Sequence, residues 1–170
     1  MQGTDRKEKR EEREEVVMAL EISTSGVKVK YCIETTAGTR PTTGYTEIPD
    51  ITSIPEYNPQ PNNLQTTPLS ATKFHTYIPG LQDPGGAMGL SANDTTALHT
   101  AWDAMVSAAA TARASGKALW IEYAIPGRDS MYYTAIPTEL GFGGAEVDAV
   151  LTTTCYLTPN SEPVWAAAST

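Results

Sequence analysis

The 170-residue sequence predicts a mainly β protein in which an antiparallel sheet packs against one α-helix. Three observations support this fold class. Apolar residues alternate with other residues, as in a β-strand, before residue 35 and again after residue 118. Residues 93–116 show the three- and four-residue apolar spacing of an amphipathic helix. Between them lies a long segment, at about residues 40–90, whose many prolines confine any strand there to an edge.

The N-terminal residues 1–17 differ from everything that follows. Acidic and basic side chains crowd together there without an apolar stripe, so we expect a flexible, solvated extension that does not pack on the core. Alternatively, Met18 is the true start and these residues are an upstream extension. In both cases residues 18–170 form a single domain, which is long enough to bury a core.

The first strand is predicted at residues 27–34, which alternate over eight positions and would turn Val27, Val29, Tyr31 and Ile33 inward. Such a strand is buried on one face only. Short strands are also possible within the proline-rich segment, near residues 64–67 and 73–78.

The helix is expected at about residues 94–115. Asn93 or Asp94 is a suitable N-cap, and Gly116 is a suitable residue just beyond the C-terminus. One apolar stripe runs along it and would face the sheet. The stripe consists of Leu98, Ala101, Trp102, Met105, Ala109 and Ala112.

After the helix the apolar period changes from that of a helix to that of a strand. Residues 119–125 and 131–136 predict a hairpin with a turn at residues 126–129. Residues 141–144 form the next break, and residues 146–157 predict a long strand. The resulting order is strand, long arm, helix, hairpin, strand. We expect an antiparallel β core with one flanking helix, in which some sheet edges stay open.

The segment from Gly44 to Gly89 is the most informative feature of the sequence. Proline-rich segments without apolar residues are typical of disordered linkers, but here apolar residues return between the prolines and glycines. This composition indicates an ordered, extended arm that needs a surface to lie on, and we interpret it as an assembly arm that binds another protein. The apolar residues expected at that interface are Tyr45, Ile48, Ile51, Ile54, Tyr57, Leu64, Leu69, Tyr77, Ile78 and Leu81.

Charge and composition limit the partners of the protein. The formal net charge is −8, and no cluster of basic residues indicates sequence-specific binding of nucleic acid. No stretch approaches 18 consecutive apolar residues, so we expect no membrane span. Cys32 and Cys155 lie in apolar runs and are interpreted as free, buried thiols rather than as a disulfide or metal pair.

Catalytic and cofactor motifs are not recognisable. His75 and His99 have no neighbouring cysteine or paired carboxylates, and each is interpreted as an ordinary solvated or hydrogen-bonded histidine. The glycines at 141–144 lack the final glycine of a dinucleotide-binding fingerprint and do not open a helix. We therefore expect no enzyme activity, no cofactor, no metal site and no small-molecule substrate.

Two stretches of the arm resemble a known family. Residues 44–55, GYTEIPDITSIP, resemble the early arm of the major tail tube proteins of long-tailed, siphovirus-type bacteriophages. Residues 76–83, TYIPGLQD, resemble the Tyr-Ile-x-Gly-Leu-x-Asp signature of the same family, and Gly85-Gly86 follow. The segments 120–127 and 152–159 fit its closing strands, so the resemblance extends over about residues 27–163. Residues 87–91 are less strand-like than in the family, and we expect a short strand there.

The resemblance implies a β-sandwich or barrel-like tail tube fold and a structural role in the virion. Subunits of this family form hexameric rings that stack into a hollow tube, through which the genome passes to the host. The implied partners are further copies of the chain, the tape-measure protein, the tail terminator and the tail-tip proteins, and DNA passes without sequence-specific binding. The implied location is the virion tail, made and assembled in the bacterial cytoplasm.

An acidic subunit suits such a conduit, because a negative lumen repels phosphate and lets DNA slide. We expect Glu122, Glu146 and Asp148, on two predicted strands, to face that lumen. Open sheet edges also fit an assembly in which neighbours complete the sheet.

Two other classes of protein remain open from the sequence. One is a stand-alone immunoglobulin-like binding or adhesion module, which would be monomeric and would not need its arm covered by copies of itself. The other is a small β-rich enzyme, which would need a pocket with converging polar groups.

Overall fold

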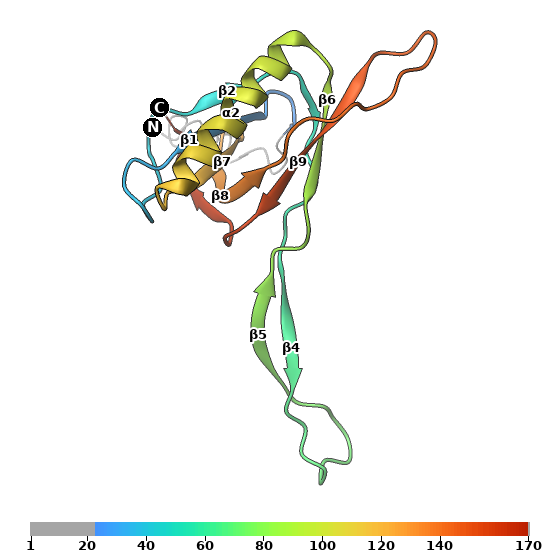
Figure 1. Ribbon diagram of the computed structural model, residues 1–170. Coiled ribbons are helices and arrows are strands. Elements are labelled where there is room, and N and C mark those ends of the chain that lie inside the picture. Colours follow the sequence, from blue (N-terminus) through green and yellow to red (C-terminus); the bar gives the residue numbers. More distant parts are fainter. Residues whose placement is uncertain (1–22, 170) are drawn as a thin grey trace, which may run out of the picture.

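The computed structural model describes residues 23–169, so the predicted N-terminal extension at residues 1–17 lies outside the described residues (Figure 1). The elements are β1 (Lys28–Ile33), β2 (Thr46–Ile48), β3 (Ile51–Ser53), β4 (Gln60–Gln65), β5 (Tyr77–Asp83), β6 (Met88–Asn93), α2 (Thr96–Ala114), β7 (Leu119–Ala124), β8 (Ser130–Pro137), β9 (Thr152–Pro159) and β10 (Val164–Ala166). The mainly β class with a single flanking helix is confirmed within these residues.

Eight strands form one curled antiparallel sheet, a half-barrel, in the order β2-β1-β7-β8-β9-β6-β3, with β10 paired to the first half of β8. Strands β2 and β3 stand at opposite ends of that order, yet only Pro49 and Asp50 separate them along the chain. Three peptide units span at most about 11 Å, so the curled sheet brings its two ends together at this turn. The sheet therefore wraps around one core instead of lying open.

Open edges were expected on the main sheet, but free strand edges also lie on a separate hairpin. Within the described residues, β4 and β5 pair only with each other and form a separate two-stranded sheet. This hairpin projects far from the body in Figure 1. The segment at residues 87–91, expected to hold a short strand, instead lies in the six-residue β6, which pairs with β9 from Met88 to Asn93.

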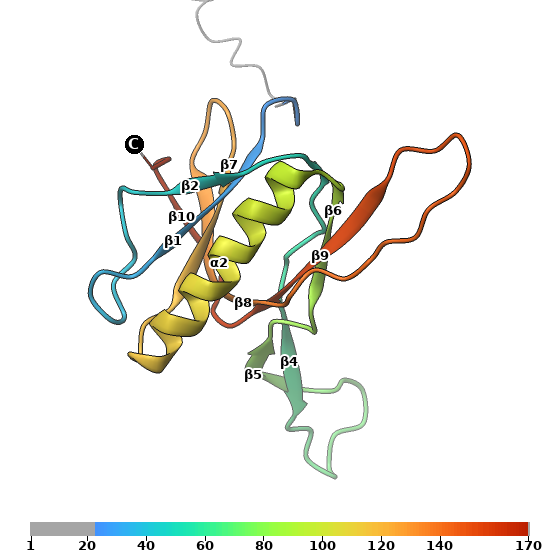
Figure 2. The same cartoon turned by 45° about the horizontal axis from the view of Figure 1, so that its top comes forward.

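Helix α2 lies across the curled sheet (Figures 1 and 2). Its N-cap is Thr95, whereas Asn93 or Asp94 was predicted. The Thr95 hydroxyl accepts a hydrogen bond from the Leu98 amide at 3.1 Å. The carboxylate of Asp94 instead lies 2.7 Å from the ring of His99. The helix ends as predicted just before Gly116, which has a positive φ of 70°.

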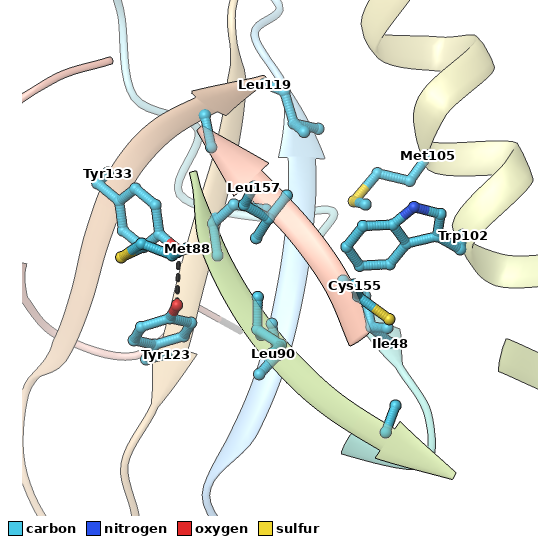
Figure 3. Packing of buried hydrophobic residues seen from close by; sticks show 14 of the residues in the cluster. Ile48, Met88, Leu90, Trp102, Met105, Leu119, Tyr123, Tyr133, Cys155 and Leu157 are labelled. Carbon is cyan, nitrogen blue, oxygen red and sulfur yellow. Dashed lines mark hydrogen bonds between the residues drawn. The ribbon is translucent and has the colours of Figure 1, made fainter. Parts of the chain in front are cut away.

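The core lies between α2 and the inner face of the sheet. Trp102 and Met105 point from the helix toward Ile48, Cys155 and Leu157 in Figure 3. Trp102 is fully buried, and its indole N–H donates to the Thr138 carbonyl at 2.8 Å. At the far end of the core the hydroxyls of Tyr123 and Tyr133 lie 2.6 Å apart (Figure 3). The buried aliphatic and aromatic side chains thus form one continuous cluster.

Strands β7 and β8 are buried on both faces, which differs from the predicted one-sided alternation. The second face is covered by two segments. Ala167 and Ser169 contact Tyr132 and Glu122 there, and Tyr45 packs against Tyr132. Strand β10, in the same C-terminal segment, pairs with residues 130–132. The sequence there is small and polar apart from Val164 and Trp165, so its pairing was not predicted.

The strand predicted at residues 146–157 is wrong in its first half. Residues 138–151 form an exposed loop, and β9 begins only at Thr152. The physical reason lies in the backbone of the segment, because Asp148 has a positive φ of 59°, which an extended strand does not allow. At the base of the loop Gly143 passes close to the start of β9, since a Cβ on it would stand 2.0 Å from the Thr152 carbonyl oxygen. In Figure 1 this loop is the orange segment that projects between β8 and β9.

Candidate assembly surface

The most exposed apolar side chains lie on the two projections, whereas those exposed on the body, such as Tyr156 and Trp165, are each about half-exposed. On the β4–β5 hairpin and its loop, Leu69 is 108% exposed, Leu81 91% and Phe74 82%. Leu64, Tyr77 and Ile78 are exposed there as well. Contiguous exposed apolar surface of this kind marks an interaction site in a folded protein.

The hairpin is held in shape by its own polar contacts. Gln65 and His75 lie 2.8 Å apart, and the Thr66 amide donates to the Thr76 carbonyl at 2.8 Å. Gly80 lies against the opposite strand, since a Cβ there would stand 2.4 Å from the Asn62 carbonyl oxygen. An isolated two-stranded hairpin is marginally stable in water. The β4–β5 hairpin is therefore a preformed projection that gains stability when another surface covers it.

The ten residues predicted for a subunit interface divide into two groups. Leu64, Leu69, Tyr77, Ile78 and Leu81 lie exposed on the hairpin. Tyr45, Ile48, Ile51, Ile54 and Tyr57 lie on the body of the subunit instead.

The placement of this second group corrects the interpretation of the first half of the arm. Ile48 and Tyr57 are buried in the core, and Ile51 and Ile54 pack against it. Tyr45 is half-buried, with its ring centroid 5.7 Å from that of Tyr132. The reason is that residues 46–53 supply β2 and β3, so their apolar residues are covered within the subunit.

The three acidic residues predicted to face a lumen lie in different environments. Glu122 is fully buried inside the subunit and presents no carboxylate to a surface, which corrects that prediction. Glu146 and Asp148 are exposed, but they lie on the loop 138–151 and not on a strand.

Glu122 is the centre of a polar network beneath the C-terminal segment. Its carboxylate accepts hydrogen bonds from the Tyr132 hydroxyl at 2.9 Å and from both the amide and the hydroxyl of Ser169, at 3.0 and 2.5 Å. The ammonium of Lys30 lies 3.9 Å away. Burial alone raises the pKa of Glu122, but these hydrogen bonds and the nearby charge outweigh it and hold the pKa below its ordinary value.

Glu34 forms a second buried network at the end of β1. It accepts hydrogen bonds from the Trp120 indole at 2.8 Å and from the amides of Ala118 and Gly38 at 3.0 Å. Burial raises the pKa of Glu34, whereas these donors and the charge of Lys117 lower it, and the lowering dominates. Both carboxylates are fully engaged within the fold, so they act as structural anchors.

The second projection, the loop 138–151, was not identified as a surface from the sequence. It exposes Val147 at 92%, Phe142 at 75% and Val150 at 73%. The only sequence signal was the run of glycines at 141–144 followed by apolar residues interspersed with acids, a pattern that also fits a strand.

Neither a metal-binding cluster nor a membrane-spanning helix is present among the described residues. In residues 23–169 no group of three His, Cys, Asp or Glu side chains could hold a metal ion. Cys32 and Cys155 are both free. Among the same residues, no helix has the length and hydropathy that a membrane crossing requires. What the described surface offers is apolar contact area on two projections.

Neither a family description nor a curated protein matches the sequence, whereas solved structures match the fold. One component of the anti-feeding prophage baseplate, determined with six-fold symmetry, superposes with a TM-score of 0.60 at 12% identity, covering 90% of this chain and all of that chain. A component of the anti-feeding prophage cap, which terminates the tube, superposes with a TM-score of 0.53 at 13% identity. The match covers 87% of this chain and 92% of that chain. At these identities the likeness concerns the fold, and the fold is one found in phage-like tail assemblies.

Proposed function

We propose that this protein is a structural subunit of a bacteriophage or phage-like tail, and specifically the subunit of a tail tube built from stacked hexameric rings. The observation that carries the proposal is the β4–β5 hairpin, which holds Leu69, Phe74 and Leu81 outside the body with no covering from the described residues. A hairpin of this kind is suited to lie on an adjacent subunit, where its apolar residues and free strand edges become buried.

The structural neighbours support the tail assignment. One belongs to a baseplate with six-fold symmetry and the other to a cap that terminates a tube, and this chain covers nearly the whole of each. A subunit that uses two different patches for its contacts generates closed rings or filaments, as a tube requires. The engaged carboxylates of Glu34 and Glu122 argue for a structural rather than catalytic use of the buried acids.

The proposed partners follow from this role. Further copies of the chain would form the rings, the tape-measure protein would occupy the tube during assembly, and terminator and tip proteins would bind its two ends. The net charge of −8 suits a conduit that DNA crosses without binding. The protein would be made in the bacterial cytoplasm and end in the tail of the particle.

Excision of the hairpin tests the proposal. Gln60 and Asp83 are paired across the hairpin, so a two-residue Asn-Gly turn can join them and replace residues 61–82. Circular dichroism should show the folded sheet and helix, because the core contacts none of the removed residues. Assembly should be lost, as seen by negative-stain microscopy and sedimentation velocity.

A matched control keeps the hairpin and changes only its polar surface, for instance Asn63→Ser at an exposed position of β4. This variant should assemble as the unchanged protein does. Normal tubes from the excised variant would contradict the assigned role of the hairpin. A strictly monomeric unchanged protein would favour the alternative of a stand-alone immunoglobulin-like binding module.

A further inference from the structure

A groove lies beside the C-terminal half of α2, between the helix and strands β7 and β8. It has a volume of about 210 Å³. Its apolar lining includes Val106, Ala109, Ile136 and Pro137. A groove of this size accepts apolar side chains from a loop but not a whole domain.

Two cations line the groove, Arg113 on the last turn of the helix and Lys117 just beyond it. Arg113 is exposed and Lys117 is half-buried. Neither forms a salt bridge with any of the residues that the structure describes. The groove is thus apolar inside and positive at its border, which favours a ligand that is apolar and acidic.

The loop 138–151 has that composition. It exposes the apolar residues Phe142, Val147 and Val150, and it carries three acidic residues, Glu139, Glu146 and Asp148, without a single basic one. None of these acids is engaged in a salt bridge within the described residues. The charge and apolar character of the loop therefore complement those of the groove.

The base of the loop is attached to the start of β9 within the subunit. Gly143 is packed against the backbone of Thr152 at its base, and the Thr153 hydroxyl donates to the Gly141 carbonyl at 3.5 Å. The turn at Val147–Asp148 places Glu146, Val147 and Asp148 at the tip. A preformed loop loses less entropy on docking than a flexible one.

The loop and the groove lie on different sides of the subunit. In both Figures 1 and 2 the loop projects away from the C-terminal end of α2, where Arg113 lies. The loop therefore points away from the groove of its own chain and toward that of a neighbour. We propose that the loop 138–151 of one copy docks into the groove between α2 and β8 of the next copy.

This contact is head-to-tail, since each copy supplies a loop on one side and a groove on the other. Repetition of such a contact closes a ring when the rotation between copies fits. The inference rests on the proposed self-assembly and adds the lateral contact within a ring, separate from the hairpin. It also assigns Glu146 and Asp148 to a subunit contact instead of a lumen.

Two charge variants test the docking. The groove variant combines Arg113→Glu with Lys117→Gln, which changes the border charge from positive to negative without placing a second acid beside the buried Glu34. The loop variant combines Glu146→Arg with Asp148→Asn, because asparagine tolerates the left-handed backbone at position 148. In each variant the loop tip of one copy meets a groove of like charge on the next copy. Each substitution pair should therefore raise the concentration needed for assembly at least about tenfold. Circular dichroism should show both folded.

Mixing the two variants gives the decisive result. In the mixture, the acidic loop of the groove variant meets the unchanged basic groove of the loop variant. The loop variant, whose loop has no net charge but a positive tip at position 146, meets the acidic groove of the groove variant. An equimolar mixture should therefore assemble into alternating, even-numbered rings at concentrations where each variant alone does not. A control with Asp103→Asn and Asp129→Asn, which are exposed and lie outside the hairpin, the loop and the groove, should assemble like the unchanged protein.

The possible outcomes are distinct. If the unchanged protein assembles and both charge variants assemble equally well, the docking is wrong while the proposed function stands. If both variants fail and the mixture fails too, another partner occupies the groove and the inference is overturned. If the unchanged protein never assembles at any concentration, the proposed function fails first and this inference with it.

Discussion

Glu122 and Ser169 are joined by two hydrogen bonds, from the Ser169 amide at 3.0 Å and from its hydroxyl at 2.5 Å. These bonds attach the C-terminal segment to the middle of β7 and bury a carboxylate that would otherwise lie on the outer face of the sheet. The Tyr132 hydroxyl completes the arrangement, because it bonds both Glu122 and the Ala167 carbonyl. The C-terminal segment is therefore part of the folded subunit and not a loose tail.

Substitution of Glu122 by glutamine should lower stability in a pH-dependent manner. The pKa of Glu122 is lower in the folded protein than in the unfolded chain, so its stabilising contribution is complete above the ordinary glutamate pKa of about 4.3. That contribution is lost as the pH falls through the folded pKa. The free energy of unfolding of the variant should fall by about 1–3 kcal/mol at neutral pH. Glutamine replaces the charged acceptor by a neutral one, and its amide group places a donor opposite the donors of Ser169.

Chemical denaturation at a series of pH values measures this effect. The difference between the two proteins should be constant near neutrality and shrink below about pH 4.3. Glu162→Gln, at an exposed position, serves as the control and should change stability little at any pH. A difference for Glu122→Gln that stayed constant down to strong acid would rule out the buried, hydrogen-bonded carboxylate.

Gly143→Ala should deform the loop 138–151. An alanine Cβ would stand 2.0 Å from the Thr152 carbonyl oxygen, so the loop or the start of β9 must shift. We expect a loss of about 1–3 kcal/mol in the free energy of unfolding, together with weaker assembly. Gly141→Ala is the matched control, since nothing lies within 4 Å of its Cβ and its stability should change by less than about 0.5 kcal/mol. Equal effects of the two substitutions would refute the close contact at position 143.

The two thiols should differ in reactivity. Cys155 is fully buried in the core, and burial together with the charge of Asp94 raises its pKa to about 11. Cys32 is half-buried, and its thiol lies near the Thr43 carbonyl at the surface. Burial raises the pKa of Cys32 as well, so the contrast between the thiols depends on access. Ellman's reagent at pH 8 should therefore modify Cys32 of the folded protein faster than Cys155, which should react only after denaturation. Rapid reaction of both in the folded protein would contradict the burial of Cys155.

Much of the fold was accessible from the sequence, because local patterns determined it. The apolar stripe from Leu98 to Ala112 predicted α2, and the alternation around Ile121 and Tyr133 predicted the β7–β8 hairpin. Their apolar residues recur at the period of a helix or a strand, so the elements can be detected without any knowledge of neighbouring segments, although the burial of β7 and β8 on both faces could not be.

The remaining features depend on long-range contacts that no local pattern records. Residues 46–53 resemble the rest of the arm in composition. They nevertheless form β2 and β3, which pair with β1 and β6 in the main sheet, and Ile48 is thereby buried. Glu122 occupies an outward position on its strand, and only the distant Ser169 turns that position into the interior. The loop 138–151 has alternating residues, but its backbone turns at Asp148 with a positive φ of 59°, which a strand does not allow. The apolar residues predicted on the hairpin are exposed in the subunit, because none of the described segments covers them, and their role as an interface stays a prediction.

Self-association of the unchanged full-length protein tests the central claim most directly. Sedimentation velocity over a wide range of concentrations, with negative-stain microscopy of the same samples, measures whether copies join and in what form. The account predicts rings or hollow tubes of uniform diameter that become more abundant as the concentration rises. A single monomeric species throughout that range, with no rings or tubes on the grid, would contradict it.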